Sequence, residues 1–130
     1  MILDSSAIVC MVEEEDGFRD LVDAVSAAPG AAVGAPTLFE TTIVLIAREG
    51  IAGRAALTVF LEENEIVALP FDERHSAIAA EAFLRYGKGR HPARLNYGDC
   101  MTYATARLAE RPLLCIGEDF ARTDLPLALS

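Results

Sequence analysis

Four acidic residues stand at positions from which their carboxylates can share one divalent cation: Asp4, Glu40, Asp99 and Asp119. Asp4 directly follows the apolar segment 1–3, and Asp119 follows the apolar segment PLLCI with two residues between. Both acids therefore lie at carboxyl ends if these segments are strands of a parallel sheet, where ligands bind. Ligation by oxygen atoms alone favours a hard ion such as Mg²⁺ or Mn²⁺.

Glu40 extends this set from a helix. Spacings of three, four and seven residues place it on one helical face with Ile43, Val44 and Ala47. We expect this apolar face to be the buried one. An ionised carboxylate turned toward a core is unfavourable unless it is paired, and the nearest basic residue is Arg48, two turns away. A shared cation would satisfy the carboxylate.

Asp99 begins a helical stripe that continues through Thr102 and Tyr103. Each aspartate also has an ordinary structural explanation. Asp4 and Asp119 are good caps for the segments that follow them, and Asp99 favourably opposes a helix dipole. The metal site is therefore predicted from the four acids together and not from any one of them.

A basic loop precedes Asp99. Residues 85–94 read RYGKGRHPAR and hold four of the eleven basic residues without an acid, although the chain has a net charge of −9. We predict that Lys88, Arg90 and Arg94 contact the phosphates of a nucleic acid, because phosphate binding needs a basic face. The alternative is a solvated loop that only balances a very acidic surface.

Short apolar segments alternate with helical ones along the chain. The predicted strands are MIL at the start, AAVGA, IVALPF and PLLCI. The predicted helices cover residues 5–15, 17–28, 36–49, 56–64, 73–86 and 97–110. Strands separated by one or two helices need crossover connections, which predicts a three-layer α/β/α sandwich with a mainly parallel central sheet. The four acids then meet near one edge of that sheet.

Length and composition predict the setting of this fold. The 130 residues suit a single domain, residues 1–130, because two halves would each bury little apolar surface. No segment reaches the roughly 20 apolar residues of a membrane span, and the start MILD lacks a basic leader. We therefore expect a cytoplasmic protein without a membrane partner. The hydrophobic fraction of 52% favours a homodimer.

Other Mg²⁺ sites built from acids fit this sequence less well. A response-regulator receiver needs an adjacent acidic pair and a late lysine, but Asp4 is followed by two serines and the only lysine is Lys88. A haloacid-dehalogenase-type phosphatase needs a second aspartate two residues after the first, where this chain has Ser6. Both protein classes are disfavoured.

Four segments around the acids resemble the PIN domain, and among PIN proteins the VapC-type toxins of toxin–antitoxin pairs. They are ILDSSA, PTLFET, HPARLNYGDC and LLCIGEDFARTDL, and the resemblance covers essentially the whole chain. It implies a parallel-sheet α/β/α fold, an acidic pocket for one or two Mg²⁺ or Mn²⁺ ions, and cleavage of tRNA or rRNA by metal-activated water.

The resemblance also assigns roles. Asp4, Glu40, Asp99 and Asp119 match the four catalytic acids of the family in that order, and we expect Asp4, Asp99 and Asp119 to hold the metal. Ser6 matches a small hydroxyl residue that supports the site, and Asp124 is a secondary candidate for the fourth acid. The family implies a homodimer and an antitoxin that covers the site. The alternative is a catalytically idle PIN fold that only binds other proteins.

Overall fold

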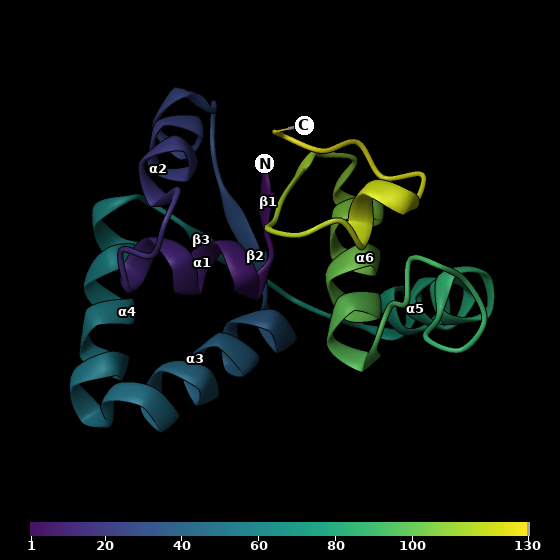
Figure 1. Ribbon diagram of the computed structural model, residues 1–130, viewed down its shortest axis with the longest axis horizontal. Helices are drawn as coiled ribbons and strands as arrows, with labels where there is room; N and C mark the ends of the chain where they lie inside the picture. The colour runs from purple at the N-terminus through teal and green to yellow at the C-terminus, as the bar shows by residue number, and fades with distance from the viewer. Residues whose placement is uncertain (130) are drawn as a thin grey trace.

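Four short parallel strands form the centre of the computed structural model, which describes residues 1–129 (Figure 1). They are β1 (Ile2–Leu3), β2 (Ala32–Gly34), β3 (Val67–Leu69) and β4 (Leu113–Leu114). Their order is β3-β2-β1-β4, and Ile2 stands opposite Ala32 on one side and Leu113 on the other. Every strand lies within a segment that the sequence predicts to be extended.

Six α-helices connect and cover the strands. They are α1 (Ser5–Val12), α2 (Phe18–Ala27), α3 (Ala35–Glu49), α4 (Ile51–Glu63), α5 (Glu73–Tyr86) and α6 (Tyr97–Ala109). A 3₁₀ turn, η1 (Phe120–Arg122), follows β4. Gly50 has a φ of 66°, which lets α3 and α4 meet without a loop, so α4 begins five residues earlier than predicted. Across residues 1–129, no helix is both long enough and apolar enough to cross a lipid bilayer.

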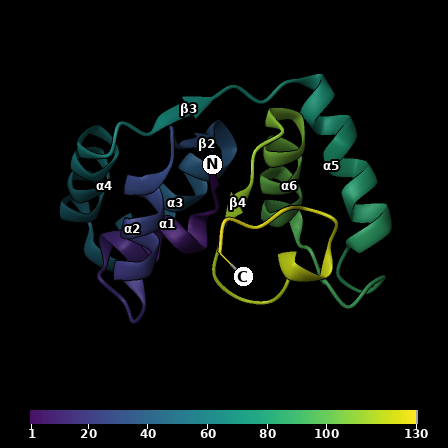
Figure 2. The ribbon, with the colours of Figure 1, turned by 90° about the horizontal axis from the view of Figure 1, so that it is seen from above.

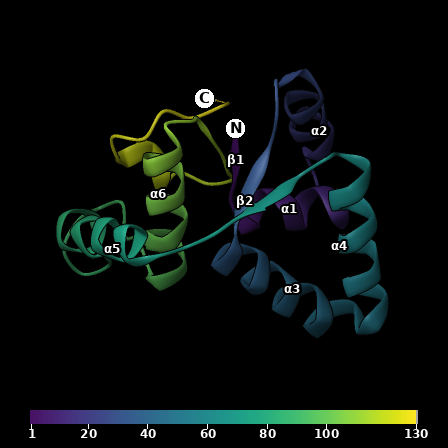
Figure 3. The same cartoon turned by 180° about the vertical axis from the view of Figure 1, so that it is seen from behind.

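The helices form two layers on opposite faces of the sheet, as Figure 2 shows. Leu3, Val33 and Leu114 pack into a core with α1, α2 and α4. Ile2, Ala32 and Leu113 pack into a second core with α5 and α6. Figure 3 shows how the segment from α4 through β3 to α5 passes from one layer to the other. The predicted three-layer α/β/α architecture is confirmed.

Helix α3 buries a different face from the one predicted. Its buried residues lie four apart along the chain: Thr37, Thr41 and Leu45. The Thr41 hydroxyl donates to the Thr37 carbonyl at 2.7 Å, and the hydroxyls of Thr37 and Thr102 lie 3.0 Å apart. Because these groups satisfy one another, threonines can be buried while Ile43 is 50% exposed and Ala47 is exposed. The predicted face was wrong, and Glu40 lies half-buried at its margin.

Candidate functional site

Asp4 is a buried carboxylate held by hydroxyl and amide groups. It directly follows β1 as the N-cap of α1 and is 6% exposed. Its Oδ2 accepts hydrogen bonds from the Ser6 amide at 3.2 Å and the Ser6 hydroxyl at 2.6 Å. Its Oδ1 accepts one from the Thr102 hydroxyl of α6 at 2.9 Å. These bonds fix the orientation of the carboxylate.

Ser6 also connects Asp4 to the loop that carries Asp119. The Ile116 amide donates to the Ser6 hydroxyl at 3.1 Å, which joins the segment after β4 to the start of α1. Because β4 ends at Leu114, Asp119 lies on an exposed loop and not directly at a strand end. Asp119 precedes η1 but makes no side-chain capping bond there. Its carboxylate is therefore not engaged in the capping role that was the alternative prediction.

Asp99 lies half-buried in the first turn of α6 and feels the other three acids. It accepts a hydrogen bond from the Asn96 amide at 3.0 Å, while Asn96 Oδ1 accepts one from the Asp99 amide at 2.9 Å. Burial raises the pKa of Asp99 to about 6. The hydrogen bond from the Asn96 amide lowers this pKa, whereas the negative charges of Asp4, Asp119 and Glu40 raise it further. The structure thus brings all four predicted acids into one electrostatic neighbourhood.

Glu40 reaches this neighbourhood from α3 through close contact with α6. A Cβ atom added at Gly98 would lie 2.5 Å from Glu40 Oε2, so the carboxylate packs directly against the glycine. Gly98 contacts Glu40 and Thr102 donates to Asp4, and the sequence alone predicted neither contact. Glycine is unfavourable in a helix by up to about 1 kcal/mol relative to alanine, and its presence beside Asp99 was the available signal of a close approach.

The negative charges of the acids also affect the pKa of a neighbouring thiol, that of Cys115. Burial raises the pKa of Cys115 to about 12, and the charges of Asp4, Asp99 and Asp119, and then that of Glu118, contribute further. Burial and these charges therefore favour the protonated form of the thiol. What this arrangement can bind is a cation.

The residues present fit a hard divalent cation in type and charge. Within residues 1–129, none of the four acids forms an ion pair with lysine or arginine; Arg48, the nearest candidate for Glu40 by sequence, pairs with Glu15 at 3.2 Å. In the same residues, no three acidic, histidine or cysteine side chains converge closely enough to ligate one ion as they stand. The charges of the other three acids act on the pKa of Asp99, so the four carboxylates are near one another although they do not meet at one point.

Asp124, the secondary candidate for the fourth acid, lies in a separate polar cluster. The Tyr103 hydroxyl donates to Asp124 Oδ1 at 2.6 Å, and Arg107 and Arg85 approach Oδ2 at 3.0 and 3.6 Å. Burial alone would raise the pKa of Asp124, but the Tyr103 bond and the two arginine charges outweigh it and lower the pKa. These contacts attach the segment after η1 to α5 and α6.

Asp124 should therefore contribute pH-dependent stability. Because its folded pKa lies below its unfolded value, the contribution is full above about pH 4 and is lost as pH falls through the folded pKa. We expect Asp124→Asn to lower the free energy of unfolding at pH 6. As the pH falls below about 4, the free energy of unfolding of the variant should approach that of the parent protein. Urea unfolding at several pH values measures this difference. A difference that stays constant with pH would contradict the assignment.

The predicted RNA-binding residues lie on an ordered, exposed loop. Lys88, Arg90 and Arg94 are exposed, and none forms an ion pair within residues 1–129. The ends of the loop are tied by hydrogen bonds from the Lys88 amide to the Leu95 carbonyl and from the Leu95 amide to the Tyr86 carbonyl, at 2.9 and 3.0 Å. The three cations are available to an external anion.

Comparison with known proteins gives the same family over nearly the whole chain. Residues 1–125 match the family model described as PIN domain. The chain is 48% identical to Ribonuclease VapC36 of Mycobacterium tuberculosis over 126 residues, covering 96% of this chain and 91% of that protein. It is 38% identical to Ribonuclease VapC of Mycolicibacterium smegmatis over 125 residues, covering 96% and 97%.

Solved structures share the fold at low sequence identity. The crystal structure of VapC20 of Mycobacterium tuberculosis, a sarcin–ricin loop cleaving toxin, has a TM-score of 0.76 at 16% identity and 95% coverage of both chains. A chain of VapBC2 from Rickettsia felis, bound to a DNA fragment from its promoter, has a TM-score of 0.77 at 12% identity, covering 97% of this chain and 94% of that one. The fold and the sequence matches agree, and the chain belongs to the PIN-domain family, with VapC ribonucleases among its relatives.

Proposed function

We propose that this chain is an Mg²⁺- or Mn²⁺-dependent endoribonuclease that acts as the toxin of a toxin–antitoxin pair in the cytoplasm. The observation that carries the proposal is the mutual placement of four carboxylates with no lysine or arginine paired to them within residues 1–129. The relatives named ribonucleases, at up to 48% identity over most of the chain, support nuclease activity.

The four acids have two different parts in the proposed hydrolysis. Asp4, Asp99 and Asp119 would hold the divalent ion, which would supply a water of lowered pKa and stabilise charge on the phosphate. Ser6 and Thr102 keep the Asp4 carboxylate oriented through the bonds described above. Glu40 forms no ion pair within residues 1–129, so its carboxylate would be available to take a proton from the attacking water. The water oxygen would bond to phosphorus as the bond to the ribose oxygen breaks, and the leaving ribose oxygen would take a proton from solvent.

The basic loop should hold the RNA backbone. Replacing Lys88, Arg90 and Arg94 with alanine is expected to weaken RNA binding. The slope of log affinity against log salt should become shallower by up to about 2, because fewer phosphate contacts form and fewer counterions are released on binding. Fluorescence anisotropy with a labelled single-stranded RNA at several salt concentrations measures the slope.

A matched variant separates local contact from total charge. Arg19, Arg54 and Arg74 are exposed on α2, α4 and α5, and their replacement by alanine removes the same three charges. We expect this control to keep the parent slope. Equal slopes for both triple variants would instead indicate that the loop only balances the acidic surface.

We propose two protein partners, an antitoxin and a second copy of the chain. A guanidinium from the antitoxin would pair bidentately with the acids of the site, and the net charge of −9 would attract a basic chain. Solved relatives of the fold include a toxin–antitoxin complex from Klebsiella pneumoniae, which supports this partner. Exposed apolar side chains on α3, namely Phe39, Ile43 and Ile46, offer surface for either contact.

Incubation of the purified protein with total RNA tests the proposed activity. We expect new RNA ends with Mg²⁺ or Mn²⁺ and none with a chelator, with positions identified by sequencing. Expression in cells should arrest growth, and co-expression with the neighbouring reading frame should prevent the arrest. RNA that stays intact under every condition would favour the idle, protein-binding PIN fold.

A further inference from the structure

Arg122 is an exposed cation on the segment that carries Asp119, and the proposed hydrolysis does not use it. It ends η1, the 3₁₀ turn that Asp119 precedes. The Arg122 amide donates to the Asp119 carbonyl at 3.3 Å, and Asp119 itself has helical backbone angles, with φ of −63° and ψ of −49°. Because residues three apart eclipse one another in a 3₁₀ helix, the side chains of Asp119 and Arg122 project from the same side of this turn.

The Arg122 guanidinium contacts the basic loop and does not neutralise Asp119. Its Nη1 donates to the Pro92 carbonyl at 3.1 Å, at an exposed position. Within residues 1–129, Arg122 forms no ion pair, although opposite charges three residues apart often pair on helices. A guanidinium carries several N–H donors in a planar fork, and the contact with Pro92 uses one of them. The cation is therefore held in place with donors available to an external anion.

This contact joins the loop that leads to Asp99 with the segment that carries Asp119. Pro92 lies in the basic loop, seven residues before Asp99. Arg122 lies three residues after Asp119, which is about 6 Å along the turn for a rise of about 2 Å per residue. An RNA strand that lies on the basic loop and reaches the acids would therefore pass the Arg122 guanidinium.

On the basis of the proposed function, we infer that Arg122 binds the RNA phosphate that neighbours the cleaved one. The planar fork of a guanidinium matches the oxygens of a phosphate in charge and geometry. A strand whose cleaved phosphate lies at the acids would present a neighbouring phosphate to Arg122, one turn away from Asp119. The alternative is a structural role, in which Arg122 only ties η1 to the basic loop.

Arg122→Gln tests the inference, because it removes the charge and keeps an N–H donor for the Pro92 carbonyl. The probe is a labelled single-stranded RNA 12-mer in chelating buffer at several salt concentrations. We expect Arg122→Gln to weaken binding about 10-fold at low salt. The slope of log affinity against log salt should become shallower by about 0.7, the value for one phosphate contact with a single strand. Arg122→Lys keeps the charge and should keep the parent slope.

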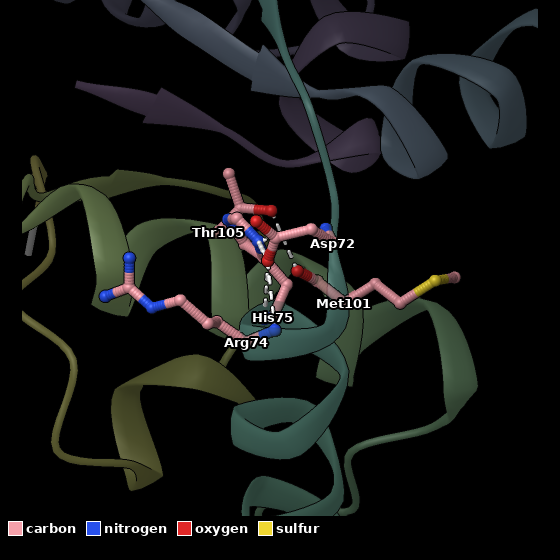
Figure 4. Close-up of polar contacts among 5 residues, drawn as sticks. All are labelled: Asp72, Arg74, His75, Met101 and Thr105. Atoms are coloured by element: carbon pink, nitrogen blue, oxygen red, sulfur yellow. Dashed lines mark hydrogen bonds and ion pairs between the residues drawn. The ribbon is translucent and has the colours of Figure 1, made fainter.

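Arg74→Gln is the matched control, at the other end of α5 from the basic loop. The Arg74 amide donates to Asp72 at 2.9 Å, and Figure 4 shows the Arg74 side chain extending away from the hydrogen bonds of this cap. The substitution therefore removes one exposed positive charge and keeps the cap. We expect Arg74→Gln to keep the parent slope.

The outcomes separate this inference from the proposed activity. If the parent protein cuts RNA and Arg122→Gln keeps the parent slope, the phosphate contact is overturned and the nuclease stands. If the parent protein does not cut RNA but Arg122→Gln gives the shallower slope, the contact stands and the nuclease is overturned. Equal flattening in Arg74→Gln, or no binding of the 12-mer by the parent, would also overturn the contact. So would a lower kcat without weaker binding, because Arg122 would then act by positioning Asp119.

Discussion

Asp4→Asn is expected to cleave RNA at least about 100-fold more slowly than the parent protein, because it removes the charge of a ligand while keeping its shape. Asp4 is the most constrained of the four acids, since it accepts three hydrogen bonds and is 6% exposed. The measurement is the initial rate of cleavage of one RNA at saturating Mn²⁺.

The same substitution should leave the fold intact. The Asn oxygen can replace Oδ2, which accepts from the Ser6 amide and hydroxyl, and the Asn amide can donate to Thr102, whose hydroxyl can then donate to Thr37. Loss of one negative charge also relieves the repulsion that Asp99 feels. We therefore expect the free energy of unfolding in metal-free buffer to change by less than about 1 kcal/mol.

A charge-matched control completes the test. Asp23→Asn makes the same chemical change at an exposed position on α2 and should cleave RNA at the parent rate. If Asp4→Asn cuts as fast as Asp23→Asn, Asp4 is not part of the catalytic site.

Gly98→Ala is expected to lower cleavage about 10- to 100-fold while the protein remains folded, the range found when residues that orient a metal site are changed. The added methyl group would overlap Glu40 Oε2, and the flexible glutamate would turn away because the α6 backbone is fixed by its cap. Gly98 does not have a positive φ, so alanine suits the backbone and stability should stay within about 1 kcal/mol of the parent.

A double-mutant cycle shows whether Gly98 acts through Glu40. In a Glu40→Ala background there is no carboxylate to displace, so Gly98→Ala should cause no further loss of activity. Additive losses from the two substitutions would mean that Gly98 supports the site in another way, for example by positioning Asp99 directly.

Local patterns were sufficient to predict the elements of the fold. The alanine-rich segment 73–86 coincides with α5, since Asp72 before it and Gly87 after it mark its ends. The four strands were predictable because strands covered on both faces are short and continuously apolar. The face of α3 was not, because periodicity cannot show that Thr37 finds a hydroxyl partner on α6.

The sequence predicts the four acids as one group, but it does not predict the residues that contact them. Asp4 was placed by the strand before it, whereas its bond from Thr102 joins residues 98 positions apart. The contact of Glu40 with Gly98 likewise joins two helices that no local pattern relates. Asp124 was a candidate because of its position in the motif, but its carboxylate accepts hydrogen bonds from Tyr103 and Arg107 on α6. Contacts of this range depend on packing, which sequence spacing does not specify.

Cleavage of RNA in ¹⁸O-labelled water, followed by mass spectrometry of the new ends, tests the central claim most directly. If the four acids promote attack by water, one ¹⁸O atom should enter each new terminal phosphate, with Mn²⁺ present and not with chelator. Ends that carry an unlabelled 2′,3′-cyclic phosphate, or that form equally well in chelator, would show that water activated at this site is not the nucleophile.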